Sequence, residues 1–431
     1  MRVLVLGAYG LIGSEIVRRL RADGLTVVGF GRSAAKGRRL APDIAWFGAD
    51  LAALCRPAQW APYLQDVDAV VNASGALQDG AIDRLSRSQQ AAIIALIEAC
   101  ARSGPRRFVQ ISAPGAERGA GTAFMRTKAE ADAALRASSL DWTILKPGLV
   151  ISAYAYGGTA LLRMLAAFPA VQLLAFPQAQ MQTVAADDVA EAVAVALTTD
   201  RLARRDVDLV ERAPHTLAAA VSAFRRWLGF GAPRFALAAP RLLSAAIGCC
   251  ADAAGWLGWR SPLRTTALKV LAGNVLGDPD QGEAALGRPL RTMEQSLAAL
   301  PSTMQERVFA RAQLAFPLLA FSLALFWIAS GVIALIHAEA AAGQLRDTAL
   351  EEHAMPIVIS GALLDIAVGA AVCVRKTARP AALAGVAVSL CYLGIGTWLA
   401  PQLWADPLGP FVKVIPAIAL ALAFACLIEE R

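Results

Sequence analysis

Three glycines near the start of the chain limit what its first part can fold into. In the stretch VLVLGAYGLIGSEIVRRL, a short apolar run is followed by Gly7, Gly10 and Gly13 and then by a helical pattern. The first glycine permits a tight turn, the second lets the backbone approach a bound group, and the third lets helix and strand pack closely. Because the start of a helix carries free amides and partial positive charge, the pattern predicts a site for the pyrophosphate of a dinucleotide.

The following segments alternate between short apolar strands and amphipathic helices as far as about residue 209. We expect strands at Arg2–Leu6, Leu25–Phe30, Ala69–Asn72, Arg107–Ile111 and Trp142–Leu145, and helices that include Leu11–Ala22 and Ala81–Arg102. Near-continuous apolar strands separated by helices are typical of a parallel sheet covered on both faces. The pattern predicts an α/β fold, a doubly wound Rossmann domain with a parallel sheet, over residues 1–213.

The end of the second expected strand bears on which dinucleotide binds. An NAD-specific site has an acidic residue there, but the sequence VVGFGRSAAKGRR has none and places Arg32 at the tip. A guanidinium suits a 2′-phosphate through paired, charged hydrogen bonds. We therefore expect NADP, with NAD as the alternative, and we interpret Arg38 and Arg39 as solvated loop charges.

Four apolar runs occupy the last third of the chain, at residues 314–336, 355–374, 381–400 and 411–428. A membrane-spanning helix needs about 20 apolar residues, and each run is close to that length. Helices of a soluble bundle show a polar stripe that these runs lack. The sequence predicts an all-α bundle of four transmembrane helices within residues 306–431, with the lipid bilayer as its partner.

Positive charge predicts the orientation of this bundle. Basic residues precede the first run and connect the second to the third, namely Arg307, Arg311, Arg375, Lys376 and Arg379, whereas the connection at 337–353 is mostly acidic. Such loops face the cytoplasm, which also accounts for the net charge of +7 without a nucleic-acid partner. We expect a multi-pass protein of the inner (cytoplasmic) membrane, with the Rossmann domain and both termini in the cytoplasm.

The segment at residues 214–305 is mixed and mostly helical in pattern, and we interpret it as a substrate lobe or linker. Within it, residues 239–259 are apolar but interrupted by Arg241 and Asp252. This stretch is either a core helix of the lobe or an interfacial helix that lies on a membrane. The cysteine and histidine spacings indicate neither a metal site nor a disulfide framework.

Several motifs recur in the same order as in one enzyme superfamily. They are the glycine spacing Gly7-x-x-Gly10-x-x-Gly13, GADL at Gly48–Leu51, NASG at Asn72–Gly75, VQISAPGAE around Ser112, and LDWTILKPGLV followed by VAADDVAEAV. Over residues 1–215 the chain resembles the extended and atypical branches of the short-chain dehydrogenases/reductases. Those branches include nitrogen-metabolite-repression regulators and an accessory subunit of respiratory complex I. From PSTMQERVFARAQLAFPLLAF onward, the chain resembles the DoxX-like membrane domain, which occurs fused to such reductases.

The resemblance implies a set of cofactor-binding residues. In the family the aspartate of the GADL motif contacts adenine, and the NASG motif lines the cofactor. The implied residues are Gly7, Tyr9, Gly10, Leu11, Ile12, Gly13, Arg32, Asp50, Leu51, Ala73, Ser74, Gly75 and Lys128.

One catalytic position departs from the family pattern. The stretch GTAFMRTKAEADAAL has Phe124 four residues before Lys128, where the family carries a tyrosine that acts as general acid. The family serine and lysine remain as Ser112 and Lys128. A positioned proton donor contributes typically about 10²–10⁴-fold in rate, and a phenyl ring cannot supply it. Tyr154 or Tyr156, after the sixth strand, is a candidate replacement, and ordinary pocket lining is the alternative interpretation of both.

Three functional hypotheses follow from this departure. The first is an oxidoreductase that reduces a lipid-soluble or quinone-like acceptor at the cytoplasmic membrane face. The second is a non-catalytic sensor that binds NADP(H). The third is an assembly factor for a membrane complex, for which the partner is a homo-oligomer or a respiratory-type complex.

The membrane segment carries one acid inside an apolar run. Asp365 lies within GALLDIAVG, where a charge at the bilayer centre costs roughly 2.5–3.5 kcal/mol on insertion scales. Asp365 has two interpretations. It either has a functional role, in contact with a proton or a quinone head group, or it forms a structural hydrogen bond between helices. His337, Glu351, Glu352 and His353 cluster at the outer face, where we expect a solvated loop.

Overall fold

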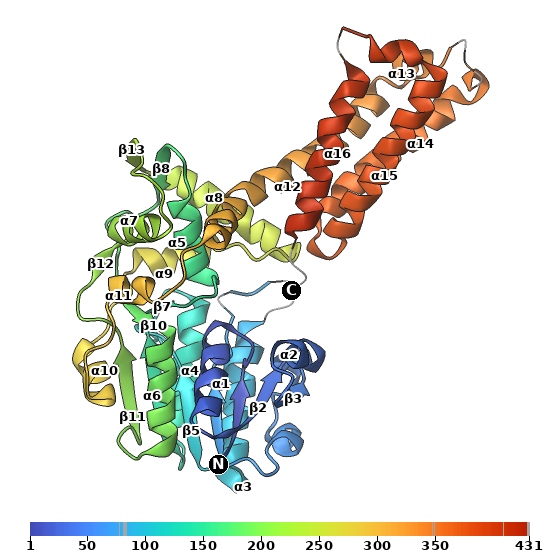
Figure 1. The fold of residues 1–431 in the computed structure, drawn as a ribbon. Helices are drawn as coiled ribbons and strands as arrows, with labels where there is room; N and C mark the ends of the chain where they lie inside the picture. The colour runs from blue at the N-terminus through green and yellow to red at the C-terminus, as the bar shows by residue number, and fades with distance from the viewer. Residues whose placement is uncertain (77, 81–83, 347, 349, 408, 429–431) are drawn as a thin grey trace. The chain divides into compact units, whose positions relative to one another are not determined.

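The computed structural model describes residues 1–431 except 77, 81–83, 347, 349, 408 and 429–431 (Figure 1). The described chain divides into two compact units. The first unit comprises Met1–Asp252 and Ser261–Ala310, and the second comprises Ala253–Arg260 and Arg311–Arg431.

A seven-stranded sheet forms the centre of the first unit, in the order β11-β6-β5-β4-β1-β2-β3. Every neighbouring pair in it is parallel. The strands are β1 (Arg2–Leu6), β2 (Thr26–Gly31), β3 (Ala45–Gly48), β4 (Ala69–Asn72), β5 (Arg107–Ile111), β6 (Asp141–Pro147) and β11 (Arg205–Leu209). Because β2 and β4 lie on opposite sides of β1, the strand order reverses there, and ligands of such sheets bind at the carboxyl ends of strands at this point.

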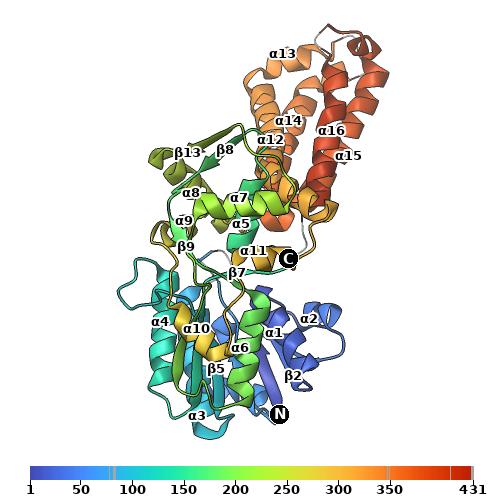
Figure 2. The ribbon, with the colours of Figure 1, turned by 60° about the vertical axis from the view of Figure 1, so that its left-hand side comes forward.

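Helices cover both faces of the sheet (Figures 1 and 2). They are α1 (Leu11–Ala22), α2 (Ala34–Leu40), α3 (Ala92–Ser103), α4 (Ala123–Arg136) and α6 (Ala186–Thr198), with the turns η1 (Leu51–Ala53), η2 (Pro57–Tyr63) and η3 (Ser86–Ala91). Successive residues of a strand point to opposite faces. Accordingly Val3 and Val5 join the core beneath α1 and α6, whereas Leu4 and Leu6 join the core beneath α3 and α4.

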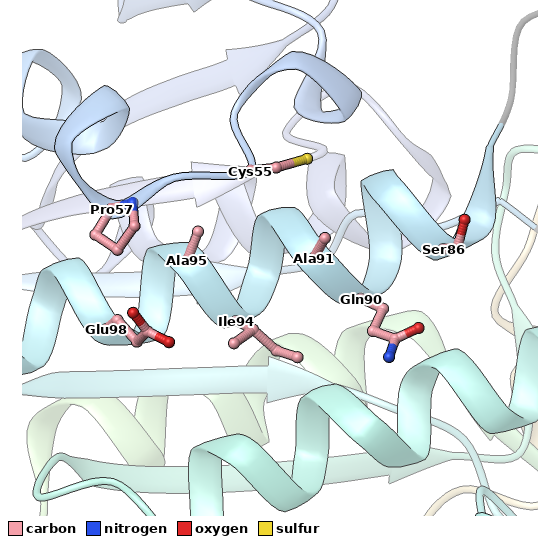
Figure 3. A pocket seen from close by; sticks show the side chains of 8 residues that line it. All are labelled: Cys55, Pro57, Ser86, Gln90, Ala91, Ile94, Ala95 and Glu98. Atoms are coloured by element: carbon pink, nitrogen blue, oxygen red, sulfur yellow. The ribbon is translucent and has the colours of Figure 1, made fainter.

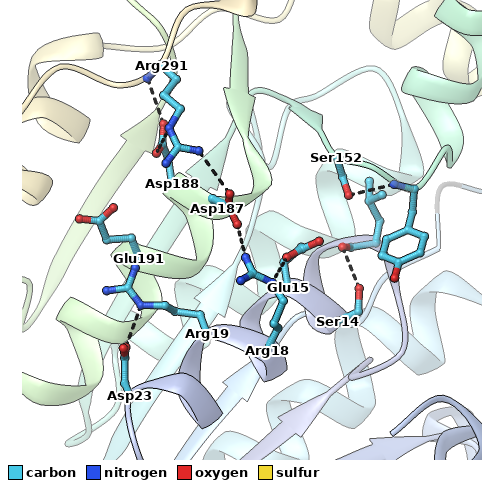
Figure 4. A network of polar contacts seen from close by, with 12 residues as sticks. Ser14, Glu15, Arg18, Arg19, Asp23, Ser152, Asp187, Asp188, Glu191 and Arg291 are labelled. Carbon is cyan, nitrogen blue, oxygen red and sulfur yellow. Dashed lines mark hydrogen bonds and ion pairs between the residues drawn. The ribbon is translucent and has the colours of Figure 1, made fainter. Parts of the chain in front are cut away.

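Charged side chains fix α1 against α6 (Figure 4). Arg18 pairs with Glu15 on its own helix and with Asp187 on α6. Asp188, whose side chain is fully buried, accepts hydrogen bonds from Arg288 Nη2 at 2.8 Å and from the Arg291 backbone amide at 3.0 Å. These contacts tie the segment at 288–291 to the helix layer that carries the glycine turn.

The rest of the first unit is a smaller lobe of short strands and helices. Its strands pair as β7 (Leu149–Ile151) with β10 (Thr183–Ala185), β8 (Val171–Leu174) with β13 (Phe235–Ala238), and β9 (Gln180–Met181) with β12 (His215–Thr216). Its helices are α5 (Gly157–Ala166), α7 (Leu217–Trp227), α8 (Arg241–Trp256), α9 (Thr265–Ala272), α10 (Pro279–Leu286) and α11 (Met293–Ala298).

The second unit is helical, and its described residues include four helices long and apolar enough to cross a membrane. These are α12 (Met304–Ile336), α14 (Ala354–Cys373), α15 (Arg375–Leu399) and α16 (Pro410–Leu427), with the short segments α13 (Ala338–Gly343), η4 (Glu351–His353) and η5 (Pro401–Trp404) between them. Glycines permit close helix contacts here, as is usual in membranes. A Cβ on Gly331 would lie 2.4 Å from the Ala362 carbonyl oxygen, and one on Gly369 would lie 2.6 Å from an Ile328 side-chain carbon.

The predicted fold class is confirmed, with some differences in detail. Strands β3 and β11 were not expected, and the helix expected at Ala81–Arg102 begins instead at η3, with 81–83 outside the described residues. The basic residues Arg375, Lys376 and Arg379 were expected in a loop, but they lie in the first turns of α15. The division at 213 and 305 remains a prediction.

The buried carboxylate of Asp188 generates a test of the fold. Removing this carboxylate takes the acceptor from the Arg291 amide and one of two carboxylate partners from Arg288, and a hydrogen bond to a charged group contributes about 1.5–3 kcal/mol. We expect Asp188→Ala to lower the unfolding temperature of the full chain in nanodiscs, followed by tryptophan fluorescence. Asp200→Ala is the matched control, because its side chain is 87% exposed and pairs with Arg107. Equal losses in the two variants would contradict the assigned role.

Candidate functional site

The turn between β1 and α1 is built by close backbone approach. Gly7 has φ +71°, a conformation that favours glycine. A Cβ on Gly13 would lie 2.1 Å from the Gly7 carbonyl oxygen, so any side chain there would push α1 away from the turn. Gly10 caps α1 without a side-chain hydrogen bond, which leaves the first amides of the helix directed to the edge of the sheet. This cradle fits the pyrophosphate of a dinucleotide.

The loop after β4 lies against this turn. A Cβ on Gly7 would lie 2.8 Å from the Ala73 carbonyl oxygen, and the Ala73 amide donates to the Leu6 carbonyl oxygen at 3.1 Å. Buried Asn72 accepts hydrogen bonds from the Ser74 amide (3.1 Å) and hydroxyl (2.5 Å). The structure therefore brings together two predicted groups, the glycine turn and Ala73–Gly75, at the point where the strand order reverses.

Aromatic side chains border the turn beside β2. The Ser33 amide donates to the Tyr9 hydroxyl at 3.3 Å, and Lys36 Nζ lies 5.5 Å from the centre of the Tyr9 ring. Arg32 is exposed at the end of β2. The predicted contact residue Asp50 caps η1, because its carboxylate accepts a hydrogen bond from the Ala52 amide at 3.0 Å.

The remaining predicted cofactor residues differ in position. Leu11 and Ile12 open α1 and are half-buried, and Leu51 opens η1. Their contact with a cofactor stays a prediction, as does that of Asp50.

A buried polar cluster joins β5 to α4. The Ser112 hydroxyl donates to the Asp132 carboxylate, and Lys128 Nζ donates to the Ile111 carbonyl oxygen at 2.9 Å. Lys128 Nζ also lies 3.8 Å from where a Cβ on Gly75 would be, and 5.6 Å from the centre of the Phe124 ring. The candidate catalytic residue Lys128 is therefore adjacent to the Ala73–Gly75 loop, with its ammonium group over the phenyl ring of Phe124, and Ser112 joins the cluster through Asp132.

Burial governs the charges of this cluster. It lowers the pKa of the Lys128 ammonium group, and the nearby Asp132 charge opposes that shift. Burial also raises the pKa of the Asp132 carboxyl, against the hydrogen bond from Ser112 and the charges of Lys128, Arg136 and Lys146. Asp132 Oδ1 has no hydrogen-bond partner among the described residues. Burial therefore favours the neutral forms of both the Lys128 amine and the Asp132 carboxyl.

The candidate replacement acid Tyr154 is an exposed residue. It exposes 64% of its surface, and its backbone amide donates to the Ser152 hydroxyl at 3.2 Å. Tyr156 is 44% exposed. A role of either tyrosine as proton donor stays a prediction.

Two family matches account for these features. Residues 7–200 match the NAD(P)H-binding family, and residues 324–422 match the DoxX-like family. The chain joins an NAD(P)H-binding Rossmann domain to a DoxX-like membrane domain. The predicted resemblance to short-chain dehydrogenases/reductases with a DoxX-like domain is thereby confirmed, as is a nicotinamide cofactor.

One relative is similar to part of the chain. The photosystem II assembly factor Ycf39 of Synechocystis sp. is 34% identical over 150 residues, which cover 34% of this chain and 44% of that protein. The chain thus spans less than half of that relative's length.

Solved structures share the fold. The NADPH-dependent quinone oxidoreductase QOR2 of Escherichia coli, complexed with NADPH, is 17% identical with a TM-score of 0.53, over 69% of this chain and 98% of that one. The dTDP-glucose 4,6-dehydratase of Bacillus anthracis, in complex with NAD, is 15% identical with a TM-score of 0.51, over 71% and 96%. At these identities the likeness concerns the fold alone.

In the DoxX-like domain, the intramembrane acid has hydrogen-bond partners. The Tyr392 hydroxyl of α15 donates to Asp365 Oδ1 of α14 at 3.1 Å, and Ser330 of α12 also hydrogen-bonds this carboxylate. Asp365 is 7% exposed. The carboxylate therefore links three helices. This agrees with the interpretation of Asp365 as a structural hydrogen bond between helices.

Two other features lie apart from the cofactor cradle. A groove of about 400 Å³ between the turn at Cys55 and helix α3 is lined by Cys55, Pro57, Ser86, Gln90, Ala91, Ile94, Ala95 and Glu98 (Figure 3), and these are not the predicted cofactor residues. Glu211, His215 and Glu294 lie close enough for a cation among the described residues. However, Glu211 already accepts hydrogen bonds from the Thr183 amide, the Thr183 hydroxyl and the Met293 amide, which explains its burial.

Asp132 is the site residue that the sequence analysis missed. It lies one helical turn after Lys128, as Lys128 lies one turn after Phe124. Residues four apart share a helix face, so an acid at this spacing from the lysine was the available signal.

The close approach at Gly13 predicts loss of cofactor binding when a side chain is added. Gly13→Val should abolish NADPH binding in a fluorescence titration of the full chain, because the new Cβ would overlap the Gly7 carbonyl. Gly119→Val is the control, since a Cβ there meets nothing within 4 Å. Unchanged affinity in a Gly13→Val chain with wild-type circular dichroism would contradict the assignment.

The raised pKa of Asp132 predicts a pH-dependent stability. The folded chain holds this proton more tightly than the unfolded chain, so the contribution to stability is full below the unfolded pKa and is lost as pH rises through the folded pKa. From about pH 4 upward, the wild type should lose stability relative to Asp132→Asn, which does not titrate. Unfolding temperatures of both chains at a series of pH values measure this, and a constant difference would disprove it.

Proposed function

We propose that the chain is a membrane-anchored oxidoreductase that uses NADPH to reduce a quinone-like, lipid-soluble acceptor at the cytoplasmic face of the inner membrane. One observation carries the proposal. Ser112 and Lys128 are retained in a buried cluster beside the Ala73–Gly75 loop, while Phe124 replaces the usual acid, in a chain with four helices suited to span a membrane.

The chemistry of a quinone suits this cluster. When bound, NADPH supplies a hydride, so one quinone takes up that hydride and one proton to become a hydroquinone. Reduction of a ketone makes an alkoxide, whose conjugate acid is about as weak as water. Reduction of a quinone makes a phenolate, whose conjugate acid has a pKa of about 10. A weaker proton donor than the family's activated tyrosine therefore suffices.

Three residues of the cluster have separate roles in the proposed reaction. Ser112 would hold the acceptor oxygen, and Lys128, whose pKa is lowered by burial, would release a proton towards it. With Asp132 protonated, as its raised pKa favours, its carboxyl would donate to Ser112 Oγ and hold Ser112 in position, while the Ser112 O–H donates to the acceptor oxygen. The similarly folded QOR2 is named as an NADPH-dependent quinone oxidoreductase, so the fold is compatible with this reaction.

NADP is the proposed coenzyme because of the charge at the end of β2. Arg32 follows the last residue of β2, where an NAD-specific site would have an acid. Its guanidinium suits the 2′-phosphate that distinguishes NADP.

The cytoplasmic orientation of the Rossmann domain is supported by the basic start of α15. The first turns of α15, which follow the end of α14, contain Arg375, Lys376 and Arg379. The opposite end of α14 is preceded by Glu351 and Glu352. Basic residues at the ends of membrane helices favour the cytoplasm.

The second candidate function is a non-catalytic NADP(H)-binding sensor or assembly factor for a membrane complex. Phe124 supports it, because the usual acid is lost while the buried cluster around Lys128 remains. The likeness to the assembly factor Ycf39 supports it as well.

Turnover separates the two functions. The full chain in nanodiscs with NADPH and short-chain quinones should consume NADPH, followed by absorbance of the reduced nicotinamide. Lys128→Met should lower kcat by about 10²-fold or more, the usual effect of removing a positioned proton donor. Lys269→Met, on α9, should leave kcat unchanged. Tight NADPH binding without turnover on any acceptor would instead favour the sensor.

A further inference from the structure

Helix α8 buries its small residues and exposes its large apolar ones. Its buried positions are small residues, Ser244, Gly248, Ala251 and Gly255, which recur at a spacing of one helical turn. Its large apolar side chains point outward, with Leu242 87% and Trp256 67% exposed. A helix of a soluble protein buries its large apolar residues instead. In water this face would therefore be costly.

The small face explains how α8 packs. A Cβ on Gly248 would lie 3.0 Å from the Thr265 methyl carbon, so the helix backbone sits close to α9. Asp252 adds polar contacts on the same side, because it accepts hydrogen bonds from Thr265 Oγ1 at 2.5 Å and from Arg264 Nε at 3.2 Å. The outward apolar face is thus the consequence of firm packing on the other side rather than of a loose helix.

The exposed apolar surface extends beyond the helix. Leu243 and Ile247 of α8 are also exposed, and the preceding strand β13 exposes Phe235 and Leu237. Between Arg241 and Asp252, the sequence LLSAAIGCCA contains no charge. Grouped apolar exposure of this kind marks an interaction surface.

The end of α8 leads into the membrane unit. Ala253–Arg260 belong to that unit, and there Trp259 Nε1 donates to the Cys373 carbonyl oxygen at 2.6 Å. The centres of the Trp259 and Phe316 rings lie 5.7 Å apart. The guanidinium carbon of Arg375 lies 5.3 Å from the centre of the Trp259 ring. Cys373 ends α14 and Arg375 begins α15, so Trp259 is fixed where two membrane helices meet at one end of the bundle. Ile247 is nine residues before Trp256, about 14 Å along a helix.

We propose that the outward face of α8, together with β13, lies in the head-group and upper acyl region of the bilayer. The partner is the lipid surface itself. Exposed Arg234 and Arg241 flank the apolar residues and suit anionic head groups, as in helices that lie in the plane of a membrane. The inference goes beyond the proposed reaction and holds whether or not hydride is transferred.

Spin-label accessibility tests this proposal on the full chain. The seven native cysteines are replaced by serine, and a nitroxide is attached to Leu242→Cys or Ile247→Cys in nanodiscs that contain anionic lipid and one copy of the chain. Leu40→Cys is the matched control, a leucine that is 62% exposed on α2. NADPH binding by each labelled chain verifies that it is folded.

The expected result is a ratio of oxygen to nickel-chelate collisions several-fold higher at 242 and 247 than at 40. Oxygen concentrates in the acyl region, and the chelate stays in water. A ratio equal to that at 40 would place α8 in water and overturn the proposal. Low accessibility to both reagents would mean that protein covers the face, which also overturns the proposal. A loss of oxygen access only when two copies share a nanodisc would identify a second copy as the occupant.

Discussion

The contact between Gly13 and the Gly7 carbonyl sets the geometry on which the rest of the Rossmann domain depends. Because neither glycine has a Cβ, α1 can begin directly at the carboxyl end of β1. The loop after β4 packs against the same turn. The start of a helix and the reversal of strand order thereby coincide, which is where open parallel sheets bind their ligands. The ion pair between Arg18 and Asp187 of α6 holds α1 in this place.

At position 124, where the family that this chain resembles carries a tyrosine, the aromatic ring is present and the hydroxyl is absent. Thr122 still caps α4, because its hydroxyl oxygen accepts a hydrogen bond from the Met125 amide, and Lys128 still reaches the end of β5. Phe124 preserves the ring but not the hydroxyl. The buried Asp132 then becomes significant, since it accepts the hydrogen bond from Ser112 and burial raises the pKa of its carboxyl. In the proposed reaction, this cluster would serve an acceptor that needs only a weak proton donor.

Local pattern predicted those parts of the chain whose burial is uniform. The strands Arg2–Leu6, Ala69–Asn72 and Arg107–Ile111 agree residue for residue with the structure, because central parallel strands are apolar throughout. Strand β3 escaped prediction because it lies at the sheet edge and is only partly buried, so its pattern AWFG is short and weak. Asp132 escaped because a charged residue on an amphipathic helix normally faces water, and only the tertiary contact with Ser112 shows otherwise. The same limit applies to α8, whose sequence cannot reveal which of its faces points outward.

We propose that the Rossmann domain supplies a coenzyme site and that the membrane helices give access to the bilayer. A cryo-electron microscopy map of the full chain in nanodiscs with NADPH would show where the coenzyme lies. We expect density for the diphosphate over the first amides of α1 and for the nicotinamide beside Ser112 and Lys128. Density for the coenzyme at any other place, or an empty turn at saturating NADPH, would contradict the proposal.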